Sequence, residues 1–355
     1  MKTTKAGAIL PRRAVEKMRP YHPPLEGRAG KIRLDFNENT AGCSPSVKQA
    51  LHRLSSDDVG MYPEQETVRR ELARHFRVAP EELLLTNGTD EALHMIADTY
   101  IERRDKVLIV EPTFAMYRFY SELAGASIEA LRYDKRLQFP MEAVLTALAT
   151  KPRVFFLANP NNPTGSVLSA VQLRKFLRAA KHTLIVIDEA YFEYCGITVL
   201  PWIRRHSNLV VTRTFSKAAG MAGLRLGCIF TNRANAAVMR KAASPYPVNV
   251  AALAAARASI RDAGFLRSML RQFAQSRLEL ATGLTRIGLT IFPSAANFIL
   301  IDLGKRTKPV VAALAREGIL VRDRSSDFGG RGYVRITVGT MAQTRRVLRA
   351  LNEVL

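Results

Sequence analysis

The chain has 355 residues, of which 47% are hydrophobic and 24% charged, and these shares are typical of an ordinary soluble globular protein. Its length allows two domains and a large core. No apolar run approaches the roughly 18 residues of a membrane span, and the apolar patch 6–10 is too short for a signal peptide. The net charge of +22 invites a nucleic-acid interpretation. Because the arginines and lysines are scattered, we expect an anion-handling enzyme without a specific nucleic-acid or membrane partner.

Three cysteines, Cys43, Cys195 and Cys228, lie far apart in the chain. Their odd number and wide spacing fit neither a disulfide framework nor a metal site. We therefore expect a reducing, cytoplasmic setting and no metal.

In chain order, residues 1–40 contain many prolines and are expected to form an extended arm. Ser44 and Pro45 then predict a helix that ends near Leu54, with Pro45 in its first turn. The prolyl break at Tyr62-Pro63 precedes a second, amphipathic helix over Glu64–His75.

From Glu82 onwards, short apolar runs alternate with helical patterns. The expected strands are 83–86, 107–110, 127–131, 154–158, 184–187 and 208–213, and the expected helices are 90–100, 115–123, 141–149 and 169–180. The strands are continuously apolar rather than alternating, which is typical of strands covered on both faces. The sequence therefore predicts an α/β fold with a mainly parallel central sheet and flanking helices.

After Pro247 the composition changes to one rich in alanine, leucine and arginine. Residues 250–287 predict one or two long helices, with Gly264 as a possible break. A smaller α+β unit is expected to follow, with strands 297–301, 319–321 and 333–338 and helices 309–316 and 341–352. We therefore expect an arm over 1–40, a large domain over 41–245 and a small domain over 246–355.

The stretch Thr214–Gly227 contains one lysine, Lys217, with two hydroxyls before it and Arg225 after it. Burial and a nearby cation both favour the neutral, nucleophilic amine. Such an amine suggests a Schiff base to an aldehyde cofactor, whose phosphate Thr214, Ser216 and Arg225 would hold. Taken alone, a Ser-Lys pair is better explained by an exposed lysine in a flexible loop, so the rest of the chain must decide.

Three other segments also follow predicted strands, and ligands of open α/β sheets bind at the carboxyl ends of strands. Asn87–Asp90 opens a helix, so that Gly88, Thr89 and Asp90 could surround a phosphate, or could form a simple capped turn. Asn159–Gly165 contains two prolines that could hold the Asn162 amide towards an oxyanion, or could form only a rigid turn.

The third segment is Asp188–Tyr191. A carboxylate at a buried strand end needs a partner, which the protonated nitrogen of a pyridine ring would supply. Tyr191 could reach an oxygen on the same ring. The alternative is a strand-end aspartate that caps the next helix.

Together these segments resemble the fold-type-I pyridoxal-phosphate aminotransferases over nearly the whole chain, and among them the histidinol-phosphate aminotransferase family. The motifs that match are Leu34–Asn39, Tyr62-Pro63, Glu111–Tyr117, Asn162–Gly165, Asp188–Tyr191, Ser216-Lys217, Arg225, Ala296–Phe298, Val321–Asp323 and Arg335–Gly339. The resemblance implies pyridoxal 5'-phosphate as cofactor, and a homodimer.

The resemblance also implies residue roles. Lys217 would bind the cofactor covalently and move a proton, Asp188 would pair with the ring nitrogen, and Asn162 and Tyr191 with the ring hydroxyl. Phe114 would stack on the ring, and Tyr62 would reach the cofactor phosphate of the neighbouring subunit. Arg335, Arg322 and Tyr21 would bind the substrate, with Asn162 beside them.

The implied reaction moves an amino group from histidinol phosphate or a related amino acid to 2-oxoglutarate. The glycine-rich segment 325–332 departs from the family pattern and puts the donor in doubt. An aromatic amino-acid aminotransferase and a threonine-phosphate decarboxylase on the same fold remain alternatives. A non-catalytic regulator that binds the cofactor is a third, although 40 residues before the first capped helix leave little room for a DNA-binding domain.

Overall fold

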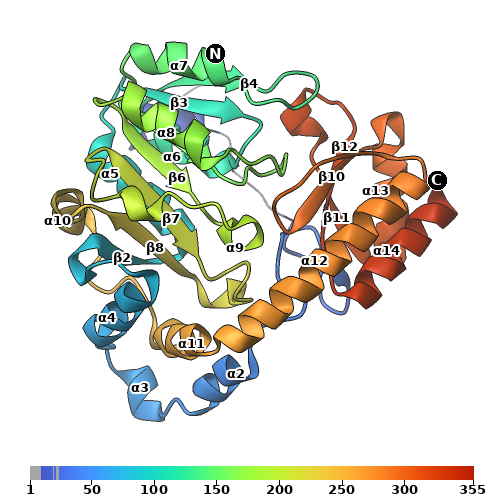
Figure 1. Cartoon of the computed structure of the whole chain (residues 1–355), viewed down its shortest axis with the longest axis horizontal. Coiled ribbons are helices and arrows are strands. Elements are labelled where there is room, and N and C mark those ends of the chain that lie inside the picture. The colour runs from blue at the N-terminus through green and yellow to red at the C-terminus, as the bar shows by residue number, and fades with distance from the viewer. Residues whose placement is uncertain (1–8, 19, 21–23) are drawn as a thin grey trace.

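The computed structural model describes residues 9–18, 20 and 24–355, and it contains two β-sheets, each with its own helices (Figure 1). The larger sheet has seven strands in the order β2-β8-β7-β6-β5-β3-β4. Their bounds are β2 Leu83–Asn87, β3 Lys106–Glu111, β4 Ser127–Arg132, β5 Val154–Ala158, β6 Leu184–Asp188, β7 Leu209–Thr214 and β8 Leu226–Thr231. Only β8 runs antiparallel to its neighbours, β2 and β7. The predicted α/β class with a mainly parallel sheet is thus confirmed.

Helices cover both faces of this sheet, so its strands are apolar at every position. In β6, for example, Leu184 and Val186 pack into one core and Ile185 and Ile187 into the other. The first core also contains α5 (Gly88–Tyr100), α6 (Ala115–Ala124) and α10 (Arg233–Ala242). The second contains α2 (Pro45–His52), α4 (Gln65–Phe76), α7 (Met141–Ala149), α8 (Ala170–Ala179) and α11 (Val250–Arg261).

Local signals fix several helix ends. The Ser44 hydroxyl accepts a hydrogen bond from the Val47 amide, and Pro45 occupies the first turn of α2, as the sequence predicts. The long helical stretch after residue 250 does divide, but at Asp262 rather than at Gly264. Asp262 ends α11, and its carboxylate caps the next helix by accepting from the Phe265 amide.

The smaller sheet has the order β1-β11-β12-β10-β9. Its strands are β1 Ile32–Leu34, β9 Thr290–Phe292, β10 Phe298–Asp302, β11 Ile319–Asp323 and β12 Tyr333–Thr337, and the helices packed against it are α12 Ala263–Arg286, α13 Thr307–Arg316 and α14 Met341–Val354. The expectation that residues 1–40 form only an extended arm needs correction. Residues 32–34 pair in parallel with β11, because Leu34 buries its side chain in the core of this sheet.

Helix α11 belongs to the first body by its packing, since Leu253 and Ala256 lie in the same core as α2 and α4. Figure 1 shows α12 running from the end of α11 along the second body. The division into an arm, a large and a small domain stays a prediction, and we propose Asp262 rather than residue 245 as the junction.

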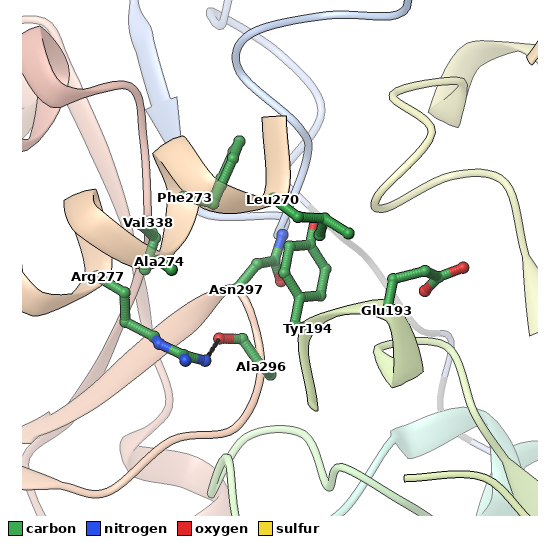
Figure 2. A pocket seen from close by; sticks show the side chains of 9 residues that line it. All are labelled: Glu193, Tyr194, Leu270, Phe273, Ala274, Arg277, Ala296, Asn297 and Val338. Carbon is green, nitrogen blue, oxygen red and sulfur yellow. Dashed lines mark hydrogen bonds between the residues drawn. The ribbon is translucent and has the colours of Figure 1, made fainter. Parts of the chain in front are cut away.

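A small cavity of about 50 Å³ lies where the two bodies meet (Figure 2). Glu193 and Tyr194 of α9 (Phe192–Cys195) line it from the larger body, and Arg277 of α12 lines it from the smaller. The Arg277 guanidinium donates a hydrogen bond to the carbonyl of Ala296, at 3.3 Å. Burial raises the pKa of Glu193 to about 7. Tyr194 packs against Phe273 of α12 and the core of the small sheet, so apolar contacts join the two bodies here.

The remaining α-helices of the part of the chain that the structure describes are short, α1 (Arg13–Lys17) and α3 (Ser56–Gly60). Within that part, no helix combines the length and the apolarity needed to cross a bilayer.

Candidate active site

Four of the predicted segments meet at one edge of the large sheet because they follow β2, β5, β6 and β7, which all point the same way. In β6 and β7, side chains alternate between the two faces. Asp188 and Thr212 therefore share a face and are hydrogen-bonded to each other, whereas Arg213 points to the other face and pairs with Glu189.

Lys217 follows β7 by three residues and is partly buried. Its Nζ donates a hydrogen bond to the carbonyl oxygen of Phe36, at 2.9 Å. Burial, and next the charge of Arg335, lowers its pKa to about 8. A substantial fraction of this amine is therefore neutral near physiological pH, as a nucleophile or a base requires.

Asp188 is 5% exposed and accepts two hydrogen bonds, from the Tyr117 hydroxyl at 2.8 Å and from the Thr212 hydroxyl at 2.9 Å. Burial raises its pKa to about 6. Among the described residues, no cationic side chain lies within 4.0 Å of this carboxylate. The site thus contains a buried anion that a protonated ring nitrogen would neutralise.

A second polar pocket forms where β2 leads into α5. Gly88 has a φ of +76°, and a Cβ at this position would lie 2.3 Å from Nη2 of Arg225. Arg225 donates to the carboxylate of Asp90 at 3.0 Å. The Thr89 hydroxyl is buried and has no hydrogen-bond partner among the described residues.

Next to this helix start, the Ser216 amide donates to the Thr214 hydroxyl at 3.0 Å. Free N–H groups at a helix N-terminus, an unpaired hydroxyl and a guanidinium are the donors that a phosphate takes. The residues present therefore fit the phosphate of the expected cofactor.

The small sheet adds Arg335 to the site. Its guanidinium is 4% exposed and donates to the amide oxygen of Asn162 and to the carbonyl of Asp35. Burial, and next the charge of Arg324, lowers its pKa to about 10. Tyr191 is buried, and its hydroxyl accepts a hydrogen bond from the Asn37 amide at 2.9 Å.

The remaining predicted residues lie as follows. Phe114 is half-buried at the start of α6, and its ring meets Tyr117 edge-on at 5.7 Å. Arg322 lies directly opposite Arg335 in the sheet. Tyr62 is 77% exposed and stacks on Tyr246, apart from these contacts. Tyr21 falls outside the described residues.

Several site residues were given no role from the sequence. Phe36 and Asn37 reach the site because β1 joins the small sheet, and a three-residue strand in a proline-rich segment gives little signal. Tyr117 lies in the motif Glu111–Tyr117, one helical turn after Phe114. This spacing places both residues on the same face of the helix and could have identified Tyr117 as a site residue. Thr212 lies two residues before Thr214 in the same strand, so the two side chains share a face, and this could have identified Thr212.

Comparisons with known proteins agree with this geometry. A sequence model of the family "Aminotransferase class I and II" matches residues 29–351. A histidinol-phosphate aminotransferase from Symbiobacterium thermophilum is 36% identical, over 97% of this chain and 98% of the relative.

Two solved structures are also similar. The histidinol-phosphate aminotransferase of Sinorhizobium meliloti, in complex with pyridoxal-5'-phosphate, is 26% identical with a TM-score of 0.89, and the match covers 98% of both chains. The L-threonine-O-3-phosphate decarboxylase of Porphyromonas gingivalis is 26% identical with a TM-score of 0.81, covering 91% of this chain and 98% of that one. The chain therefore belongs to the class I and II aminotransferases, and its cofactor is pyridoxal phosphate.

Proposed function

We propose that the amino donor of this transaminase is histidinol phosphate or a related amino acid, and that 2-oxoglutarate is the acceptor. The observation that carries the proposal is the environment of Arg335. It is almost fully buried, yet no carboxylate among the described residues lies within 4.0 Å of its guanidinium. A buried cation without an ionic partner is costly, so an anionic group of the substrate is expected to pair with it.

The relatives from Symbiobacterium thermophilum and Sinorhizobium meliloti support this choice of donor, since both are, by name, histidinol-phosphate aminotransferases. A guanidinium binds carboxylate and phosphate equally well through paired N–H groups. Arg335 is therefore suited to the phosphate-bearing donor in one half-reaction and to the dicarboxylate acceptor in the other.

When bound, pyridoxal phosphate supplies an aldehyde and an electron-poor ring that weakens the bonds at the substrate Cα. Lys217 would remove and return the proton at Cα, and its lowered pKa suits a base that works near neutral pH. Asp188, held by Tyr117 and Thr212, would accept a hydrogen bond from the ring nitrogen and keep it protonated. Tyr191 and Asn162 would orient the ring hydroxyl.

Phosphate binding would fall to the start of α5 and the Lys217 loop. Gly88, Thr89 and Asp90 supply backbone N–H groups and the free hydroxyl, while Arg225, Ser216 and Thr214 close the pocket from the other side. Phe114 would cover one face of the ring. These roles are proposals that rest on the contacts described above.

A homodimer is part of the proposal. Met61 is 71% exposed, Tyr62 77% and Tyr246 58%, so large apolar side chains gather on one surface. A second copy of the chain would cover them and would bring Tyr62 to the partner's cofactor phosphate. The cytoplasmic location stays a prediction from cysteine usage.

A panel of amino donors, each tested with 2-oxoglutarate, decides the donor. We expect histidinol phosphate to give a kcat/KM well above that of phenylalanine. Preference for phenylalanine would instead identify an aromatic aminotransferase. Release of carbon dioxide from threonine phosphate without any 2-oxo acid would identify a decarboxylase.

A further inference from the structure

The small sheet turns a row of arginines towards the large body. In β11, Ile319 and Val321 point into the core behind the sheet, so Arg322 lies on the opposite face. Arg335 of β12 is directly opposite Arg322, and its neighbours Val334 and Ile336 point into the same core. Both arginines therefore face the site that contains Lys217.

Arg324 continues this row. It lies two residues beyond Arg322, and its amide donates to the carbonyl of Tyr333 at 2.8 Å, so the strand pairing extends to it. Two-residue spacing returns a side chain to the same face, one step along from the Arg322–Arg335 pair. The positive charge of Arg324 acts to lower the pKa of both Arg335 and Tyr191, which agrees with a side chain on the same face of the sheet.

The side chain of Arg324 is only 11% exposed, and it forms an ion pair with Asp327. Its Nε is buried without a hydrogen-bond partner among the described residues, and the same holds for Nε of Arg335. Burial raises the pKa of Asp327, which means that the ionised form of this carboxylate is destabilised. Two buried N–H donors on one face thus remain to be satisfied.

The charges in this row do not balance. Arg322, Arg324 and Arg335 bring three positive charges, and Asp327 offsets one of them. No other carboxylate of the described residues lies within 4.0 Å of these guanidinium groups. Two charges remain, and like charges this close repel unless a ligand neutralises them.

We propose that Arg324 is a specificity-determining residue that selects donors with a divalent phosphate monoester over donors whose only anionic group is a monovalent carboxylate. Asp327 pairs with the Arg324 guanidinium between turnovers and competes with the substrate phosphate for it. This inference rests on the proposed function, because it assigns a substrate class to the same site.

The test uses the full-length holoenzyme and its Arg324→Gln variant. Charge-assisted hydrogen bonds of this kind give roughly a 10- to 100-fold change. We expect kcat/KM for histidinol phosphate to fall by that factor, mainly through KM, while kcat/KM for phenylalanine changes less than about twofold. Asp327→Asn, which frees Arg324, should lower the inhibition constant of inorganic phosphate. Arg345→Gln removes an exposed positive charge from α14 and is the control for the effect of net charge on substrate binding.

An equal loss with both donors would show a structural role and overturn the proposal, as would no change with either. The inhibition constant of inorganic phosphate, measured against the best donor, keeps the test independent of the proposed substrate. If the wild-type enzyme rejects histidinol phosphate but Arg324→Gln still raises that constant tenfold or more, only the choice of donor is wrong. If the constant is unchanged, Arg324 does not bind phosphate.

Discussion

Lys217 and Asp188 are two side chains of the site whose pKa the fold shifts strongly and in opposite directions. Burial lowers the pKa of the amine to about 8 and raises that of the carboxyl to about 6. The two shifts have opposite signs but a common cause, because in each case burial penalises the charged form. Cofactor binding would relieve both penalties, because the amine would bind covalently and the carboxylate would gain a protonated ring nitrogen as partner.

The pKa of Lys217 can be tested in the cofactor-free protein. An amine-reactive reagent acts on the neutral form, so the rate of Lys217 labelling should rise with pH and level off above about pH 8. Mass spectrometry of the labelled peptide would measure this rate, with the exposed Lys181 as the reference amine. A labelling rate at Lys217 that still rises steeply at pH 10 would contradict the assignment.

Asp188 predicts a pH-dependent stability. Its folded pKa is raised, so the stabilisation it gives is present below about pH 4 and is lost as the pH rises through about 6. The cofactor-free protein should therefore lose up to about 3 kcal/mol of unfolding free energy over this range through Asp188. Denaturant titrations at several pH values should show this dependence reduced in Asp188→Asn. Identical pH profiles for the two proteins would rule out the shift.

The catalytic role of Lys217 predicts a larger effect. Lys217→Ala should lower kcat by at least about 10²–10⁴-fold, the range of a lost acid–base group, and should abolish the absorbance of the covalently bound cofactor. Lys181→Ala should retain both. A variant that keeps turnover with an unchanged cofactor spectrum would refute the assignment of Lys217.

At the scale of elements, the site depends on close approach between the start of α5 and the start of β8. A Cβ on Gly227 would lie 2.5 Å from the backbone carbon of Gly88, and one on Gly88 would meet Arg225. Only glycines allow these segments to touch, and Gly88 in addition has a positive φ. The phosphate pocket is therefore set by backbone packing as well as by side chains.

Gly88→Ala should weaken cofactor binding about tenfold or more, because the added methyl group displaces Arg225 and strains the backbone by about 1 kcal/mol or more. Fluorescence titration of the cofactor-free protein with pyridoxal phosphate measures this. Gly223→Ala is the matched control, since a Cβ there meets nothing within 4 Å. Equal affinities in the two variants would show that Gly88 does not shape the pocket.

A buried ion pair lies at the ends of β6 and β7, on the face of the sheet opposite to Asp188. Arg213 of β7 donates to Glu189 at 2.8 Å, and both are at most 7% exposed. Glu189→Gln should cost about 3–5 kcal/mol of unfolding free energy, because Arg213 would keep a buried, uncompensated charge. Thermal and denaturant unfolding would measure the loss. Glu81→Gln, in an exposed pair with Arg233 at 3.7 Å, should change stability by less than about 1 kcal/mol.

These elements show what the sequence could predict. The strands before Asn87, Asn159 and Asp188 were predictable because both of their faces are apolar and a polar turn follows each. Strand β8 was not predicted, because its apolar run begins within Thr214–Gly227, a stretch whose predicted role was to bind the cofactor. Strand β1 has only three residues, and its partner lies at the other end of the chain. Local pattern carries no information about such pairing.

At the scale of the molecule, the site is assembled from two bodies. Asp188 and Lys217 come from the larger, Arg335 from the smaller, and Asn37 lies between them with its backbone amide bonded to Thr337 and its side chain to Tyr191. Asn297 adds a further contact by donating to the carbonyl of Asn37 at 3.0 Å. Residues 35–39 are therefore part of the site rather than a separate arm.

The proposed dimer predicts complementation between an impaired and an inactive subunit. Tyr62→Phe should weaken cofactor binding, and Lys217→Ala should abolish turnover. When the two variants are mixed and allowed to exchange, a mixed dimer contains one site with both Lys217 and Tyr62 intact. Recovery of activity beyond the sum of the separate variants is the expected result. Activity equal to that sum, after mass spectrometry has verified exchange, would exclude a shared site.

The pairing of β1 with β11 also has a consequence for synthesis on the ribosome. Strand β1 must wait for β11, which is synthesised after all seven strands of the larger sheet, so that sheet can form earlier. During that interval the nascent larger body already presents Asp188 and Lys217, but Asn37 has no hydroxyl of Thr337 to accept from its amide. Pyridoxal phosphate that binds the nascent chain would therefore meet an unfinished pocket, and productive loading is expected only after β11 and β12 have been synthesised and β11 has paired with both β12 and β1.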